Sequence, residues 1–211
     1  MILGLLPAAA SGRALDVGAA HGYMAATLRE RGYHVAGIEA DPDLAREASN
    51  YCNEVFVADL DGPLPQFTEG FDLILYGDVL EHLRNPLDVL MSLDRNLRPN
   101  GVVIISLPNV ANIYVRLQLL LGRFDYQDRG ILDRTHLHFY TRKSFREFLD
   151  QAGLEIIQFS ATPIPLPMVV PERFHGRVLA LLHDCNAWLA RTWQSLFGYQ
   201  FIAVTRRRNT A

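Results

Sequence analysis

The chain has 211 residues, with 20 lysines and arginines against 23 acidic residues and a formal net charge of −3. This length predicts a single domain over residues 1–211 with a hydrophobic core of its own. The charge balance, and the lack of a basic run before Arg206–Arg208, disfavour a nucleic-acid partner held through its phosphates.

Apolar segments and cysteines narrow the class of protein further. No apolar segment is long enough to cross a bilayer. The apolar run in residues 1–10 is short and lacks a preceding cationic region, so we do not interpret it as a secretion signal. Cys52 and Cys185 lie far apart and provide neither metal-ligand spacing nor a disulfide framework. We therefore expect a cytoplasmic protein without a transmembrane segment.

Strand patterns alternate with helical patterns along the chain, which predicts a doubly wound α/β fold, a parallel sheet with helices on both faces. The predicted strands are residues 13–17, 34–39, 54–58, 71–76, 101–107, 154–161 and 199–206. The predicted helices are residues 22–31, 42–51, 86–97, 109–121, 141–152 and 173–196. The last strand follows a long helix and a turn at Gly198, so it can pair antiparallel with the strand before it.

The first predicted strand ends at Asp16 and leads through a glycine-rich turn, Gly18 to Gly22, into a helix. A turn of this kind brings the backbone close to a ligand and points free N–H groups at it. The next strand ends at Glu39, at an offset where an acid can accept both hydroxyls of a ribose. Turn and acid together predict a cofactor that contains a nucleoside.

The glycine spacing separates two classes of cofactor. The dinucleotide pattern G-x-G-x-x-G, placed on Gly18, requires glycine where the chain has Ala20 and Tyr23. The pattern acid-x-G-x-G-x-G instead finds Asp16, Gly18 and Gly22 and departs from glycine only at Ala20. Alanine is then expected at a position where glycine, which tolerates a positive φ, is usual.

This second pattern resembles motif I of the class I S-adenosylmethionine (SAM) methyltransferases. Residues 71–83, which contain Asp-Val-Leu-Glu-His-Leu, are similar to the motif IV region of that family, and residues 97–109 resemble its turn and fifth strand. The resemblance covers roughly residues 10–160. It implies SAM as the cofactor and a Rossmann-like sheet of seven strands in which only the last strand runs backwards.

Ligands of open α/β sheets bind beyond the carboxyl ends of the strands, so residues that follow the predicted strands are candidates for the site. For cofactor binding these are Asp16, Gly18, Ala20, Gly22, Glu39, Asp59, Leu60 and Asp78, and for substrate binding Asn109. We expect Glu39 to bind the ribose hydroxyls, and Asp16 and Asp78 to flank the ammonium group of SAM. The resemblance implies that Asp59 accepts from the adenine amino group and that Leu60 packs on the ring.

A hydroxyl acceptor must lose a proton as it is methylated, which favours a histidine as general base. His82 lies four residues beyond Asp78, at the start of a predicted helix. His136, His138 and Tyr140 alternate in a segment that we expect to be extended, with the three side chains on one side. This segment resembles the DRTHLRFFT segment of a bacterial methyltransferase group linked to cell-surface carbohydrates and secondary metabolites. That group has arginine at the place of His138, so His136 is the preferred base and His82 the second catalytic candidate, with His138 and Tyr140 as substrate contacts.

A metal site formed by Glu81, His82, His136 and His138 is a further hypothesis, because these side chains are good ligands. Glu81 and His82 are adjacent, however, and adjacent residues of a helix diverge by about 100°. The sequence analysis therefore predicts no metal.

The tail, residues 162–198, predicts a proline-rich connector followed by a helix over 173–196 with apolar residues at helical spacing. This helix could pack on the sheet, form a lid over an apolar acceptor, or contact a second copy in a homodimer.

The sequence thus predicts a SAM-dependent methyltransferase that acts on a small molecule or sugar, at oxygen. Three alternatives remain at this point. They are an NAD(P)-dependent oxidoreductase, a relative that binds SAM or a partner without catalysis, and methylation at nitrogen or carbon.

Overall fold

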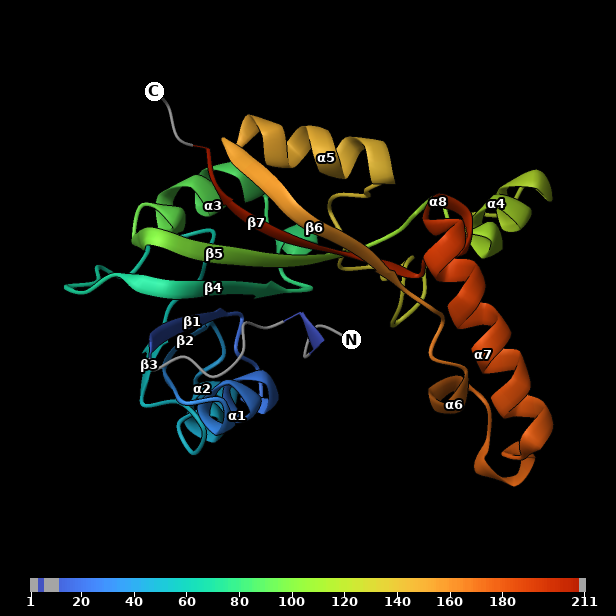
Figure 1. Cartoon of the computed structure of the whole chain (residues 1–211), viewed down its shortest axis with the longest axis horizontal. Helices are drawn as coiled ribbons and strands as arrows, with labels where there is room; N and C mark the ends of the chain where they lie inside the picture. The colour runs from blue at the N-terminus through green and yellow to red at the C-terminus, as the bar shows by residue number, and fades with distance from the viewer. Residues whose placement is uncertain (1–3, 6–11, 209–211) are drawn as a thin grey trace.

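The computed structural model describes residues 4–5 and 12–208. Of the apolar start discussed above, all but residues 4–5 lies outside the described residues. Seven strands form one sheet in the order β3-β2-β1-β4-β5-β7-β6 (Figure 1). The strands are β1 (Gly12–Val17), β2 (Tyr33–Glu39), β3 (Glu54–Val57), β4 (Phe71–Gly77), β5 (Leu97–Pro108), β6 (Leu154–Thr162) and β7 (Gln200–Arg207).

All neighbouring strands from β3 to β5 are parallel, and β7 runs antiparallel to both β5 and β6. This confirms the predicted α/β fold with a reversed last strand. The chain order reverses between β1 and β4, which are neighbours in the sheet. Open sheets bind their ligands at such a reversal, beyond the carboxyl ends of the strands. The segments beyond Val17 and Gly77 are therefore the candidate ligand site.

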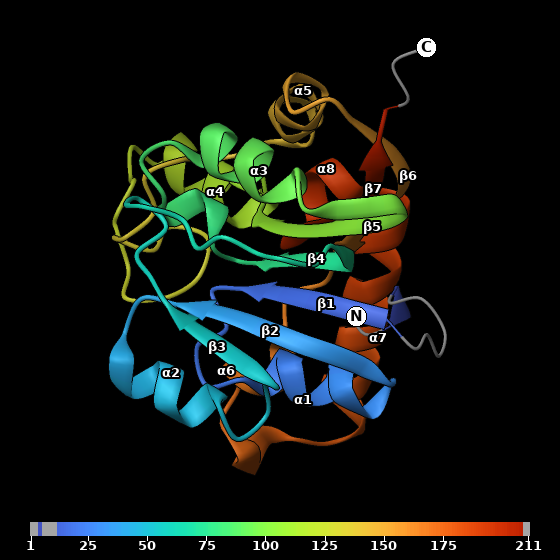
Figure 2. The same ribbon diagram turned by 90° about the vertical axis from the view of Figure 1, so that its left-hand side faces the viewer.

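Helices cover both faces of the sheet, as Figure 2 shows. On one face the core includes Ala25 and Leu28 of α1 (Tyr23–Glu30) and Ala48 of α2 (Pro42–Ala48). On the other face the core is formed with α3 (Pro86–Asp94) and α5 (Arg142–Gln151). The strands between these two layers read as nearly continuous apolar runs because both of their faces are buried.

Local start signals place several helices where the sequence predicts them. Asp41 accepts hydrogen bonds from two backbone N–H groups at the start of α2, and Pro42 follows at the first helical position. Thr141 and Ser144 form a reciprocal capping box at the start of α5. Gly153 ends that helix with a φ of 72°. These signals fix the helices that frame the sheet.

The tail differs from its prediction. The connector contains a short helix, α6 (Leu166–Val169), which the proline count hid. The predicted helix 173–196 is divided into a 3₁₀ turn (Glu172–Phe174), α7 (Arg177–Thr192) and α8 (Gln194–Phe197). Figure 1 shows α7 projecting away from the sheet, on the same side as α4 (Ile113–Leu120).

Most apolar side chains of α7 are exposed. The helix therefore does not bury its apolar face on the sheet, which was one of its three predicted roles. Trp188 is 62% exposed and Leu181 is 70% exposed, and Ala190 is its buried residue. The lid and the homodimer contact both remain predictions.

Within the described ranges, no helix combines the length and apolar character that crossing a membrane requires.

Two asparagines beyond β5 attach the tail to the sheet. The side-chain amides of Asn109 and Asn112 both donate to the backbone oxygen of Gly198, at 2.8 Å each. The Asn109 amide also donates to the backbone oxygen of Ser195 at 3.3 Å. Both asparagines are fully buried. Asn109 therefore connects β5 to the turn before β7, and the structure does not place it at an acceptor site as predicted.

A buried aspartate makes stability depend on pH. Burial raises the pKa of Asp94 to about 7, although Arg207 opposes the shift. An unfolded aspartate titrates near 4, so the folded chain binds more protons between pH 4 and 7 and loses stability as the pH rises through this window. We expect Asp94→Asn to gain roughly 1–3 kcal/mol relative to the wild type between pH 5 and 8, measured by urea unfolding. If the free energies of unfolding of the variant and the wild type differed by the same amount at pH 5 and at pH 8, Asp94 would not be protonated in the folded state.

Candidate functional site

The glycine-rich turn after β1 has three residues with positive φ. They are Gly18 at 73°, Ala20 at 45° and Gly22 at 79°. Ala20 thus adopts the left-handed conformation that the motif requires, although it carries a Cβ. The backbone of the turn follows the predicted three-glycine form despite the alanine.

Glycine is needed at both ends of this turn because neighbouring atoms approach closely. A Cβ on Gly18 would lie 2.9 Å from a methyl group of Val79, which follows β4. A Cβ on Gly22 would lie 2.9 Å from the Tyr51 ring and 3.0 Å from the Cα of Ala48. The turn is therefore packed between α2 and the segment after β4, at the chain reversal of the sheet.

Glu39, at the end of β2, holds the turn with its carboxylate. One oxygen accepts a hydrogen bond from the backbone N–H of Ala20 at 2.8 Å, and the other accepts from Asp41 at 3.0 Å. A carboxylate offers about four lone-pair positions, so both oxygens can still accept from a ligand. This placement agrees with the predicted ribose contact, which stays a prediction.

Asp16 lies beneath the turn and is 3% exposed. Its Oδ2 has no hydrogen-bond partner within the described residues. Burial raises the pKa of Asp16 to about 7, with a smaller contribution from Glu39. A buried carboxyl with a free oxygen is costly unless a donor reaches it, so Asp16 is suited to a ligand ammonium or to the turn itself.

The residues after β3 lie near the same edge. Asp59 is exposed, and its Oδ1 accepts from the backbone N–H of Asp61 at 2.9 Å. Leu60 is 7% exposed and belongs to the core beside α3 and α5. The predicted contacts of both residues with an adenine ring stay predictions.

Asp78, directly after β4, joins three strand ends. Its φ is 56°, a strained value for a residue with a Cβ. Its Oδ1 accepts from the Ser106 hydroxyl of β5 at 3.1 Å and from the Gln200 amide of β7. These bonds hold the carboxylate at the end of β4, on the edge where the glycine-rich turn also lies.

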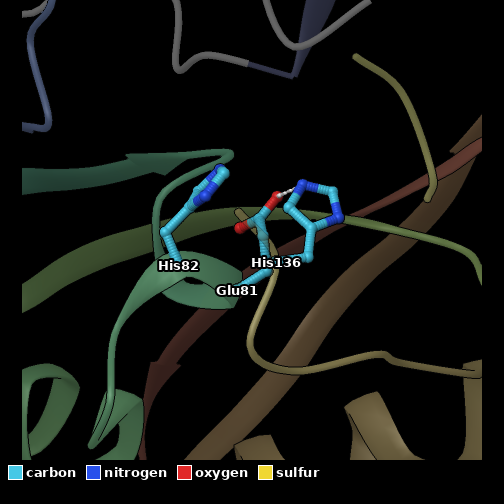
Figure 3. Close-up of side chains that lie close together, drawn as sticks. All are labelled: Glu81, His82 and His136. Carbon is cyan, nitrogen blue, oxygen red and sulfur yellow. Dashed lines mark ion pairs between the residues drawn. The ribbon is translucent and has the colours of Figure 1, made fainter. Parts of the chain in front are cut away.

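Three residues beyond Asp78, the chain forms a second group of polar side chains, the Glu81–His82–His136 cluster. One ligand atom of each side chain lies within 4.8 Å of the other two. Figure 3 shows Glu81 between the two imidazoles, with all three side chains extending to the same side of the backbone. The His82 and His136 rings meet edge to face, with centroids 4.7 Å apart. Both predicted catalytic histidines are therefore neighbours in space.

The backbone of Glu81 holds the two parts of the cluster together. Its carbonyl oxygen accepts from the N–H groups of Leu137 and His138, at 2.8 and 3.1 Å. Residues 80–82 form one turn of 3₁₀ helix, where the sequence predicted the start of a helix. In this turn the adjacent side chains of Glu81 and His82 reach the same site. The geometric argument against a shared metal site was therefore wrong for these two residues.

The hydrogen bonds of the two histidines determine which ring nitrogen carries the proton. Nδ1 of His136 lies 3.1 Å from the backbone oxygen of Ile131, which can only accept, so Nδ1 carries the proton. Nδ1 of His82 lies 3.0 Å from the Thr135 hydroxyl, which itself donates to Asp133 at 2.6 Å. Thr135 must therefore accept from His82. In the neutral form, Nε2 of each ring keeps a free lone pair.

Burial sets the charges within the cluster. Glu81 is fully buried, and its carboxylate oxygens have no hydrogen-bond partner in the part of the chain that the structure describes. Burial raises the pKa of Glu81 to about 8, and Asp78 acts in the same direction. Burial and the neighbouring His82 lower the pKa of His136, so its neutral form predominates at pH 7. The neutral imidazole of His136 and the ring of His82 thus lie beside a carboxyl group that has no hydrogen-bond partner among the described residues.

His138 and Tyr140 do not join this cluster. Nε2 of His138 lies 3.3 Å from the backbone oxygen of Arg84. Tyr140 is 7% exposed and packs against Phe148 of α5. Both residues line a hollow beside α3 and α5, apart from His136. The shared side that an extended segment would give is not seen, since residues 136–139 form no strand and the rings of His136 and His138 contact Ile131 and Arg84 respectively.

Glu81 is a site residue that the sequence did not single out. It was considered only as a ligand in the metal hypothesis, which was rejected. The available signal is the adjacent Glu-His pair together with the His-x-His segment 54 residues later. These two signals become one site only when the Glu81 carbonyl pairs with residues 137 and 138.

Comparison with known proteins gives independent information. A family model described as "Methyltransferase domain" matches residues 2–159. The ubiquinone biosynthesis O-methyltransferase of Rickettsia canadensis is 26% identical over 148 residues, which are 67% of the chain and 62% of that protein. The tRNA 5-carboxymethoxyuridine methyltransferase of Escherichia coli is 27% identical over 69% of the chain and 60% of its own length. The chain thus spans less than two thirds of the length of these relatives.

Solved structures share the fold. A SAM-dependent methyltransferase from Mesorhizobium loti aligns with a TM-score of 0.65 and 17% identity, over 98% of this chain and 96% of that one.

Proposed function

The chain belongs to the class I family of SAM-dependent methyltransferases, and on this premise we propose that it methylates an oxygen atom of a small-molecule or carbohydrate acceptor. SAM is the methyl donor of the family. The observation that carries the choice of oxygen is the pair of imidazoles, His82 and His136, whose rings meet edge to face and whose Nδ1 atoms are held by Thr135 and Ile131. Imidazoles of this kind can accept the proton that a hydroxyl acceptor loses on methylation.

The carboxyl edge of β1 to β4 provides the binding site for SAM in this proposal. The glycine-rich turn contacts the amino acid portion, with Asp16 and Asp78 beside its ammonium group. Glu39 accepts hydrogen bonds from both ribose hydroxyls through the lone pairs that Ala20 and Asp41 leave free. Asp59 and Leu60 contact the adenine. These assignments rest on the order of the strand ends and on the free acceptor positions described above.

The chemical step is an in-line displacement at the methyl carbon of the sulfonium. The acceptor oxygen forms the new bond to carbon, the bond between carbon and sulfur breaks, and S-adenosylhomocysteine leaves with both electrons of that bond. The donor is already activated, so the protein aligns the two reactants and assists loss of the hydroxyl proton. His136 and His82 act on the acceptor oxygen, since Nε2 of each ring has a free lone pair.

A small acceptor is favoured over a nucleic acid by the charges of this chain. The net charge is −3. Of the three arginines near the C-terminus, Arg206 pairs with Glu155 and Arg208 with Asp150, while Arg207 donates to backbone oxygens of Asp94 and Leu97. Each of these three cations thus already has a partner within the protein. The tRNA-modifying relative makes RNA the alternative acceptor to include in any assay.

An apolar hollow of about 340 Å³, linked to the cluster through Ile131, is a candidate for part of the acceptor site. It is lined by Tyr114 of α4, Ile131, Leu132, Ile164 and Tyr199, among others. Ile131 is also the residue whose carbonyl orients His136. A volume of this size is at the lower end of the range for ligand pockets. We propose that this hollow holds an apolar part of the acceptor, while the reacting hydroxyl lies at the cluster. The free thiols Cys52 and Cys185 are consistent with the proposed cytoplasmic location.

Calorimetric titration tests the cofactor site. We expect the wild-type protein to bind SAM and not NAD. Glu39→Ala is expected to weaken SAM binding by about 1–3 kcal/mol, because the ribose hydroxyls lose their acceptors. Glu54→Ala is a matched control, since Glu54 is an acid on the neighbouring strand β3 but lies at the amino end of the strand, where it pairs with Arg13. Equal affinity in Glu39→Ala and the wild type would show that the ribose lies elsewhere, and heat from NAD alone would refute the proposed function.

A further inference from the structure

In the Glu81–His82–His136 cluster, no hydrogen bond joins the carboxyl group of Glu81 to either imidazole. The Nδ1 protons of both histidines are directed away from the cluster, toward Ile131 and Thr135. Nε2 of His136 lies 4.0 Å from Oε1 of Glu81, beyond the length of a hydrogen bond. Neither an ionised nor a protonated Glu81 therefore satisfies the group as it stands.

The burial of the Glu81 carboxyl group also points to a missing ligand. Its side chain is fully buried, and its oxygens find no hydrogen-bond partner among the described residues. Buried polar groups are nearly always paired, and a buried carboxylate without a partner is costly. A cation placed between the carboxylate and the two Nε2 atoms would satisfy all three groups at once.

We infer that Glu81, His82 and His136 hold a divalent transition-metal ion of the Zn²⁺ type. Two imidazole nitrogens and one carboxylate form a donor set that suits Zn²⁺, Mn²⁺ or Co²⁺, whereas Mg²⁺ prefers oxygen ligands alone. Three protein ligands leave an open coordination position.

The groups around the cluster match those that orient metal-binding histidines. Such histidines usually donate their second N–H to a carbonyl or, directly or through another group, to a carboxylate. His136 donates to the carbonyl of Ile131, and His82 donates to Thr135, which donates in turn to Asp133. The two rings are thus fixed in the tautomer that presents Nε2 to a metal.

The role of the ion deepens the proposed function and rests on it. At the open position the ion binds the acceptor hydroxyl and lowers its pKa, and the released proton passes to solvent water. The resulting anionic oxygen then takes the methyl carbon from the sulfonium, and the electron pair of the broken bond remains on sulfur. His82 and His136 would then act as ligands of the ion that activates the oxygen, and not as bases in their own right.

Metal binding can be measured without SAM or an acceptor, on tag-free protein treated with a chelator and then dialysed. Titration with Co²⁺, followed by its visible absorption, and calorimetry with Zn²⁺ are expected to show one ion per chain. Glu81→Gln and His136→Gln are expected to weaken binding at least 100-fold. His34→Gln removes an exposed histidine of β2 outside the cluster and serves as the matched control, with unchanged binding. Binding that is absent from the wild type, or equal in all four proteins, would overturn the inference.

Thr135 tests the geometry of the site. Thr135→Val removes the acceptor for the His82 N–H and is expected to weaken metal binding about 10-fold, whereas Thr135→Ser keeps the hydroxyl and is expected to restore it. Equal affinity of both variants would show that Thr135 does not orient His82. Failure of the proposed function gives a different result, namely stoichiometric metal binding without methyl transfer to any hydroxyl acceptor.

Discussion

Replacing His136 by glutamine is expected to lower the rate of methyl transfer by about 100-fold or more while SAM affinity stays within a factor of two. The side chain lies in the Glu81–His82–His136 cluster, with Nε2 toward the other two residues and Nδ1 held by Ile131. Glutamine cannot present the same lone pair at the same place, whether that lone pair receives a proton or holds an ion. The glycine-rich turn and Glu39 are separate from it and remain intact.

The measurement is transfer of a labelled methyl group from SAM onto a panel of acceptors that contains a catechol, a sugar and tRNA. The variant is compared on the acceptor that the wild type methylates, with His34→Gln as the control and calorimetry for SAM. Wild-type turnover in His136→Gln would show that this histidine takes no part in methyl transfer. Equal loss of SAM affinity would instead indicate a damaged fold.

Replacing Gly22 by valine is expected to abolish SAM binding, with an affinity at least 100-fold lower, and to destabilise the protein by roughly 2–4 kcal/mol. The φ of Gly22 is 79°, a conformation that a β-branched residue avoids. Its Cβ would also lie 3.0 Å from the Cα of Ala48, a backbone atom that cannot rotate away. The turn must then move, and its N–H groups no longer point at the ligand.

Ala20→Gly is the matched control in the same turn. Ala20 already adopts a φ of 45°, so glycine relieves strain there, and we expect unchanged SAM affinity and a gain in stability of up to about 1 kcal/mol. Thermal unfolding and calorimetry on both variants check this pair. If Gly22→Val bound SAM as tightly as the wild type, the turn would not form the cofactor site.

Much of the fold could be predicted because local signals agree with the final packing. The strands β1, β2 and β4 are apolar runs with an acid or a glycine at their end or directly after it, and Pro42 and Thr141 mark helix starts. The reversed last strand followed from the turn at Gly198 and from the family resemblance. Where proline and exposed apolar residues dominate, in residues 162–198, pattern alone did not show the short helix α6 or the break before Gln194.

The gathering of the cofactor candidates at one edge could also be predicted, because each follows its own strand and parallel strands end at one edge. The contacts of the acceptor candidates could not. Asn109 looked like a free polar residue after a strand, but its amide is used to hold the Gly198 turn. Glu81 looked like an ordinary helical acid. Its importance depends on a pairing between residues 81 and 137 that no local pattern encodes.

A crystal structure of the protein grown with S-adenosylhomocysteine tests the central claim most directly. We predict the ligand beyond the carboxyl ends of β1 and β2, with both ribose hydroxyls on the Glu39 carboxylate and the amino acid portion against the turn from Gly18 to Gly22. A ligand bound away from this edge, or crystals in which only a nicotinamide dinucleotide occupies it, would contradict the account.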